Sequence, residues 1–126
     1  MAEVLFHDNV TIIGYHAFYN CRNLKRVKLP EGLLRMEDFA FGCNSLREIT
    51  IPASVQFVGQ YVFYMSKSLQ RVVFTPTTNI VELSRGIFAR CSDLQFVELP
   101  QNLQSIPKSC FDLCTSLTQL QIPASV

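Results

Sequence analysis

The side chains with the greatest chemical potential in this sequence are five cysteines and two histidines. A thiol becomes a nucleophile when a histidine lies beside it, and thiols and imidazoles at short spacing bind zinc. Four of the thiols recur at a matching position along the chain: Cys21, Cys43, Cys91 and Cys114. Ser66 takes that position once, the thiol count is odd because of Cys110, and no C-x-x-C pair has histidine partners. We therefore predict buried free thiols rather than a metal site or a disulfide ladder, which favours a reducing compartment.

The two histidines, His7 and His16, both lie near the N-terminus. A Cys–His nucleophile would pair His16 with Cys21, but Cys21 falls at a position that we expect to be buried. The position of His16 is variable and is occupied in the later units by Phe39, Tyr61, Gly86 and Ser109. The sequence has no glycine-rich phosphate loop, no nucleophile elbow and no matched pair of carboxylates. It predicts a protein that is not an enzyme and that holds no cofactor and no metal.

These cysteines and histidines belong to an internal sequence repeat that runs through the chain. Its fixed points are a Phe, a following Leu, an alternating apolar pair and, in most units, a closing Pro. The phenylalanines are 22 to 25 residues apart, at Phe18, Phe41, Phe63, Phe88 and Phe111. The alternation, clearest in residues 46–52, predicts a strand in each unit. The segment around each Phe is too short for a full helix and predicts a helical turn or a 3₁₀ piece.

A unit of this length cannot bury its own apolar side chains, so the units must stack, with parallel strands and a buried stack of the five phenylalanines. We predict a single domain over residues 1–126. Its repeats span about 7–29, 30–51, 52–74, 75–99 and 100–122, and residues 123–126 start a further repeat. The second unit is one residue short, which we place between Phe41 and Cys43, and the fourth gains two residues within 75–78, where we expect a small bulge.

The run Ile-Pro-Ala-Ser-Val at 51–55, followed by Val58-Gly59 and Val62-Phe63, resembles a BspA-type leucine-rich repeat, and residues 13–24 resemble it equally. The resemblance covers about residues 7–126. It implies an α/β fold: a leucine-rich repeat solenoid that forms a right-handed, curved superhelix of about five 22–25-residue repeats, with a parallel β-sheet on the concave face. It also implies a role in recognition, such as adhesion or surface binding, and the family has no shared catalytic residues.

The concave face is where we expect a partner to bind, because every second strand residue points away from the core. One predicted column is Arg26, Glu48, Arg71, Phe96 and Gln119. The next is Lys28, Thr50, Val73, Glu98 and Gln121. We predict that the binding residues are Arg26, Lys28, Glu48, Arg71, Val73, Phe96 and Glu98, with Phe96 as the anchor beside Arg71. The N-terminal end of this face is predicted to be basic, with Arg22, Lys25, Arg26, Lys28, Arg35 and Arg47.

Composition limits the class of partner. The 126 residues contain 11 Lys and Arg against 10 Asp and Glu, which leaves a net charge of +1. This excludes a generally basic surface, so we predict a protein partner and no nucleic acid. No apolar run approaches the roughly 20 residues of a membrane span, so we predict no membrane insertion. Residues 1–8 do not have the pattern of a signal peptide, which favours the cytoplasm unless the chain is a fragment of a secreted or surface protein. The alternative function is a structural, self-assembling unit that associates end to end.

Overall fold

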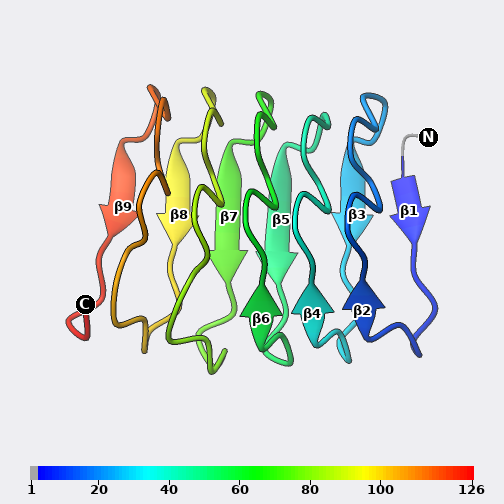
Figure 1. Cartoon of the computed structure of the whole chain (residues 1–126), viewed down its shortest axis with the longest axis horizontal. Coiled ribbons are helices and arrows are strands. Elements are labelled where there is room, and N and C mark those ends of the chain that lie inside the picture. The colour runs from blue at the N-terminus through cyan, green and yellow to red at the C-terminus, as the bar shows by residue number, and fades with distance from the viewer. Residues whose placement is uncertain (1–2) are drawn as a thin grey trace.

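The computed structural model describes residues 3–126, which form a parallel β-solenoid of nine short strands (Figure 1). The strands are β1 (Glu3–Leu5), β2 (Ile12–Ile13), β3 (Arg26–Lys28), β4 (Arg35–Met36), β5 (Glu48–Ile51), β6 (Phe57–Val58), β7 (Arg71–Phe74), β8 (Phe96–Glu98) and β9 (Gln119–Gln121). One face carries β1, β3, β5, β7, β8 and β9 side by side, and we call it the concave face. A second sheet has the order β2-β4-β6. The predicted stacked solenoid with a parallel sheet is therefore confirmed.

The register of the concave face places equivalent residues of successive units side by side. Arg71 pairs with Glu48 on one side and with Phe96 on the other, and Phe96 pairs with Gln119. β1 lies ahead of the first predicted repeat, and its Val4 pairs with Val27 of β3. The sheet therefore begins one strand earlier than the sequence pattern indicated.

The predicted α/β fold class is wrong in its helical part, because residues 3–126 contain no helix. The segments around each Phe are chains of turns in which the residues two before and two after the Phe have left-handed φ, for example +57° at His16 and +62° at Asn20. The N–H groups of His16, Phe18 and Asn20 donate to carbonyls of the next unit at 2.8–3.2 Å. The same three donors recur at all four junctions between the five units. These N–H groups hydrogen-bond to the neighbouring unit, so a helix cannot use them.

The shortened second unit differs from its prediction at one position. Counting from the Phe, the slot of Cys21, Ser66, Cys91 and Cys114 is filled by Asn44, whereas Cys43 takes the left-handed position before it, with φ of +54°. The missing residue therefore lies between Asn44 and Leu46, not between Phe41 and Cys43. Asn44 compensates for it: its Oδ1 accepts the Leu46 N–H at 3.0 Å and its Nδ2 donates to the Phe41 carbonyl. The strand of this unit, β5, lies in the coil next to that of β3, but the two strands do not form a hydrogen-bonded ladder.

The two extra residues of the fourth unit lie in a turn that follows β7. The Thr78 N–H donates to the Thr75 carbonyl at 2.9 Å, and the Thr75 hydroxyl donates to the Ile51 carbonyl at 2.7 Å. The second sheet ends at β6, and the described fourth and fifth units add no strand to it. The insertion thus directly follows β7, and the β7-β8-β9 ladder stays in register.

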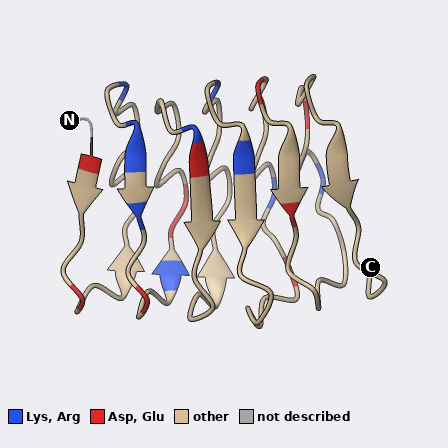
Figure 2. Ribbon diagram, turned by 180° about the vertical axis from the view of Figure 1, so that it is seen from behind, with Lys and Arg blue, Asp and Glu red and all other residues tan. Residues whose placement is uncertain are grey.

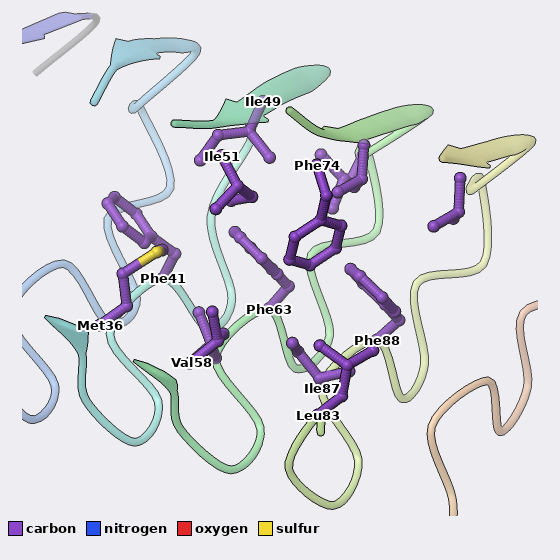
Figure 3. Packing of buried hydrophobic residues seen from close by; sticks show 14 of the residues in the cluster. Met36, Phe41, Ile49, Ile51, Val58, Phe63, Phe74, Leu83, Ile87 and Phe88 are labelled. Atoms are coloured by element: carbon purple, nitrogen blue, oxygen red, sulfur yellow. The ribbon is translucent and has the colours of Figure 1, made fainter. Parts of the chain in front are cut away.

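The predicted phenylalanine stack forms the centre of the core (Figure 3). Ring centroids of successive members are 5.2, 6.1, 5.8 and 5.5 Å apart, with the rings within 18° of parallel. Phe41, Phe63 and Phe88 are fully buried, and the two end members, Phe18 and Phe111, are half-buried. Because each inner ring packs against a unit on either side, the stack joins neighbouring coils into one core.

Candidate functional site

A groove of about 720 Å³ runs across the concave face. It crosses the N-terminal ends of five strands, β3, β5, β7, β8 and β9, from the first unit to the fifth. Ten residues line the groove: Lys25, Arg26, Arg47, Glu48, Gln70, Arg71, Gln95, Phe96, Thr118 and Gln119. Each strand contributes its first residue and the residue just before it, so the groove is a direct product of the repeat.

The groove is strongly basic although the chain as a whole is nearly neutral. Four cations and one anion line it, which gives a formal charge of +3 against +1 for the chain. The cations belong to the first three units, and Figure 2 shows the basic residues on β3 and β7 with the acidic start of β5 between them. The one salt bridge among residues 3–126, between Arg35 and Glu37, lies outside the groove. The groove cations are therefore available to an acidic partner.

Arg71 and Phe96 form the best-defined contact in the groove. The guanidinium carbon of Arg71 lies 4.3 Å from the centre of the Phe96 ring, within the range of a cation–π interaction. Phe96 is half-buried and Arg71 is exposed, so the pair offers an apolar surface with a fixed charge beside it. This is the composition that dominates the energetics of many protein interfaces.

Both predicted columns form in the sheet, because Val73 pairs with Thr50 and with Glu98 just as Arg71 pairs with Glu48 and with Phe96, but only the first column lines the groove. Arg26, Glu48, Arg71 and Phe96 line the groove. Lys28 lies in a separate hollow of about 330 Å³ between β3 and β5, where the ladder is missing. Glu98 lies in another hollow of about 310 Å³ near the C-terminus, with Ile122. Val73 is half-buried on β7, in register with Glu98.

Five lining residues were missed by the column argument, because they precede the strands rather than belong to them: Lys25, Arg47, Gln70, Gln95 and Thr118. Their backbones extend the ladder: Gln70 N–H donates to the Arg47 carbonyl at 2.7 Å, and Gln95 N–H donates to the Gln70 carbonyl at 2.9 Å. The sequence could have identified these residues, because each of them directly precedes the first-column residue of its unit.

Two residues of the predicted basic region lie elsewhere. Arg35 is on β4 of the second sheet, where it pairs with Glu37 at 2.8 Å and stands 4.3 Å above the ring of Phe57. Arg22 borders a hollow lined also by Cys43 and Lys67. The Arg35–Phe57 pair thus has the geometry of Arg71–Phe96 on a different face, which makes it a natural control.

Burial favours the protonated, unreactive form of three thiols, Cys91, Cys110 and Cys114. Burial is the main cause that raises the pKa of Cys110 to about 12 and that of Cys114 to about 11, and it raises the pKa of Cys91 still further. A nucleophile or metal ligand needs the thiolate, which these sites disfavour. Cys91 and Cys110 are buried as predicted, whereas Cys21, Cys43 and Cys114 are half-buried. Among residues 3–126, no group of three or more His, Cys, Asp or Glu side chains could hold a metal ion.

A second cluster of chemistry-bearing side chains lies on the turns between β2 and β3, between β4 and β5, and between β6 and β7. We call it the tyrosine patch: Tyr15, His16, Tyr19, Phe39, Tyr61 and Tyr64. His16 stacks on Tyr15 at 4.0 Å, and Phe39 stacks on Tyr61 at 5.2 Å. The ring of Tyr61 covers Gly86, whose φ of +64° and lack of a side chain allow that approach. The patch contains every tyrosine of the sequence.

Stacked coils, a core shared between units and a wide sheet with an open groove define a solenoid repeat protein. A family model of the BspA type leucine-rich repeat region matches residues 1–118 in six copies, so this chain belongs to that family. The count of six agrees with β1 as the strand of a unit before the five predicted from the sequence. The resemblance seen in the sequence is therefore confirmed. No curated protein sequence matches the chain.

Solved structures of bacterial leucine-rich repeat proteins are similar to the chain. A protein from Bacteroides ovatus is 32% identical with a TM-score of 0.89, over 96% of this chain and 31% of that one. The T. pallidum leucine-rich repeat protein is 35% identical with a TM-score of 0.85, over 93% and 55%. A protein from Eubacterium ventriosum, 20% identical with a TM-score of 0.87, covers 98% and 33% and shares the fold. The chain spans between a third and about half of the length of these relatives.

The part of the chain that the structure describes includes no helix with the length and apolar character needed to cross a bilayer.

Proposed function

We propose that this chain is a non-catalytic protein–protein interaction module that binds its partner in the groove of the concave face. The observation that carries the proposal is the Arg71–Phe96 pair, a half-buried aromatic ring with a guanidinium 4.3 Å above it, inside the groove. An aromatic side chain beside an arginine supplies contact area and directed hydrogen bonds together. A role in adhesion or surface recognition fits a family of repeats that present a broad sheet to other proteins.

The absence of catalysis is part of the proposal, and the state of the thiols supports it. Burial raises the pKa values of Cys91, Cys110 and Cys114, so their thiolates are scarce at neutral pH. His16 is stacked between Tyr15 and Tyr19 at 4.0 and 4.6 Å, in the tyrosine patch and away from these thiols. The groove itself contains cations, amides and an aromatic ring, which are binding groups.

Capture with three matched baits tests the proposal: the wild-type chain, Arg71→Ala/Phe96→Ala and Arg35→Ala/Phe57→Ala. Both variants remove one cation–π pair with the same 4.3 Å geometry, but only the first lies in the groove. Proteins captured from an extract of the expressing cells are identified by mass spectrometry. We expect a partner that is retained by the wild type and by the control variant and is lost from the groove variant. Equal recovery by all three baits would refute binding in the groove.

Assembly through the ends is the second candidate function. β9 has a ladder partner on one side only, β8, and Ile122 next to it is 57% exposed. An apolar side chain beside an unpaired strand edge favours association with another sheet. This function predicts a mass that rises with protein concentration and falls back in Ile122→Asp. A constant monomeric mass at high concentration would refute assembly through the ends. Because Ile122 does not line the groove, Ile122→Asp tests this function separately from groove binding.

A further inference from the structure

We infer that the groove binds an acidic, extended segment of its partner, laid across the strands along the axis of the solenoid. The inference rests on the proposed function and specifies the partner of the same site. Its basis is the arrangement of charge, length and polarity in the groove.

Charge favours an acidic segment. Lys25, Arg26, Arg47 and Arg71 are exposed and outnumber the single anion, Glu48, four to one. None of these five side chains is in a salt bridge within residues 3–126. In the sheet Glu3 lies beside Arg26 and Glu48 beside Arg71, so the groove keeps an excess of positive charge that a partner with carboxylates can balance. The rest of the chain has a net charge of about −2, so the attraction is confined to the groove rather than spread over the surface.

Length favours an extended segment. The groove crosses five neighbouring strands, and adjacent strands lie about 4.8 Å apart, so it is about 19 Å long. An extended chain advances about 3.3 Å per residue, and about six residues therefore fill the groove. Because the groove is narrow, with two lining residues per strand, it matches one chain better than the broad surface of a folded domain.

The groove also has a direction. Its charged residues all belong to the first three units, whereas the fourth and fifth units contribute Gln95, Phe96, Thr118 and Gln119. Amide side chains can donate to and accept from a peptide backbone, and the ring of Phe96 can cover an apolar side chain. We therefore expect the carboxylates of the segment to lie over the first three units and an apolar side chain to lie against Phe96.

A single-stranded nucleic acid is a weaker match to the same features. Such ligands need a continuous basic track and several aromatic rings on which successive bases stack. Here Glu48 interrupts the basic residues between Arg26 and Arg71, and Phe96 is the one ring in the groove, with Arg71 already on its face. We therefore assign the groove to a peptide.

The test selects ligands from a display library of random peptides about eight residues long, slightly longer than the groove. The baits are the wild-type chain, Arg26→Glu/Arg71→Glu, and Arg35→Glu as the charge-reversed control outside the groove. Arg26 and Arg71 are exposed and make no recorded side-chain hydrogen bond, and Arg35 loses only its exposed pair with Glu37, so both proteins should keep the wild-type circular dichroism spectrum. The best peptide is then synthesised with its amide counterpart, in which Asn and Gln replace Asp and Glu.

We expect the selected peptides to carry clustered Asp and Glu at one end and an apolar residue at the other. The amide counterpart should bind about tenfold more weakly or worse, and binding should fall as salt rises. Arg26→Glu/Arg71→Glu should lose the peptide, whereas Arg35→Glu should retain it.

Three outcomes would overturn the inference. The first is the selection of neutral or basic peptides. If Phe96→Ala then abolishes the binding of those peptides, the groove remains the site of the proposed function, but its partner has a different chemistry. Failure to enrich any peptide would exclude a linear segment, and the capture experiment would then decide separately whether a folded partner uses the groove. Binding of poly-uridylate as tightly as the best peptide, lost on charge reversal, would assign the groove to nucleic acid.

Discussion

Replacing Phe63 with Ala should cost the chain about 3–5 kcal/mol of unfolding free energy. The side chain is 0% exposed, and its ring lies between those of Phe41 and Phe88, at 6.1 and 5.8 Å. The substitution removes the buried ring, leaves a cavity and breaks two stacking contacts of about 0.5–1.5 kcal/mol each, which are included in the total. Since domains of this size are stable by about 5–15 kcal/mol, the loss is large.

Phe111→Ala is the matched control, because Phe111 occupies the same position in the repeat at one end of the stack. It is half-buried and has a single ring neighbour, Phe88, at 5.5 Å. We expect it to cost about half as much as Phe63→Ala. Urea unfolding followed by far-UV circular dichroism measures both, and an unchanged m-value shows that the comparison is valid. A cost below about 1 kcal/mol for Phe63→Ala, or equal costs for the two variants, would refute the assignment of the stack as the core.

Three further predictions concern the thiols, the shortened unit and the tyrosine patch. Burial, and secondarily the charge of a neighbouring thiol, raises the pKa of Cys91 above its usual value of 9.0, so the unfolded chain loses this proton first. The buried, protonated Cys91 thiol therefore contributes fully to stability below pH 9, and above pH 9 the free energy of unfolding falls by about 1.4 kcal/mol per pH unit. Urea titrations at several pH values should show a shallower decline for Cys91→Ser. Asn44→Ser replaces the amide with a shorter hydroxyl, as at Ser66, and removes the Oδ1 acceptor of the buried Leu46 N–H, so it should lower the unfolding free energy by about 1–3 kcal/mol; an unchanged urea midpoint would contradict the bridging role of Asn44. Gly86→Ala would place a Cβ 2.2 Å from the Tyr61 ring at a left-handed φ, so the loss of unfolding free energy measured in urea should exceed about 1–2 kcal/mol. When Tyr61→Ala is already present, the loss should shrink to about 1–2 kcal/mol, which is the cost of the left-handed φ alone. An equal loss in both backgrounds would exclude the ring contact as the cause.

The sequence predicted the sheet and its columns well, because side chains alternate with a period of two along every strand. That period, combined with the alignment of the repeats, places Arg71 next to Phe96, as the register shows. It could not predict the turns, since the left-handed φ values at Phe39 and Tyr61 belong to residue types that seldom adopt them. These conformations are imposed by hydrogen bonds to the next unit, which are non-local.

The site was predicted in part for a related reason. The pattern identifies residues that point away from the core, but it gives no information on where the surface is hollow. The groove follows the N-terminal ends of the strands, so it includes Arg26 and Lys25 and excludes Lys28, which lies two residues further along β3. Arg35 was grouped with the basic residues of the concave face because of its neighbours in sequence, although its coil had already turned onto the second sheet.

The tyrosine patch gives the molecule a built-in optical label. The chain has four tyrosines and no tryptophan, and all four tyrosines lie on turns of the first and third units, at or before residue 64 and outside the groove. Intrinsic fluorescence therefore reports on the N-terminal half of the solenoid, whereas far-UV circular dichroism reports on the backbone of every coil. A partner seated in the groove leaves the emission largely unchanged. In a thermal melt, coincident fluorescence and dichroism curves mean that the coils unfold as one cooperative block, and separated curves mean that the two ends of the array come apart in turn.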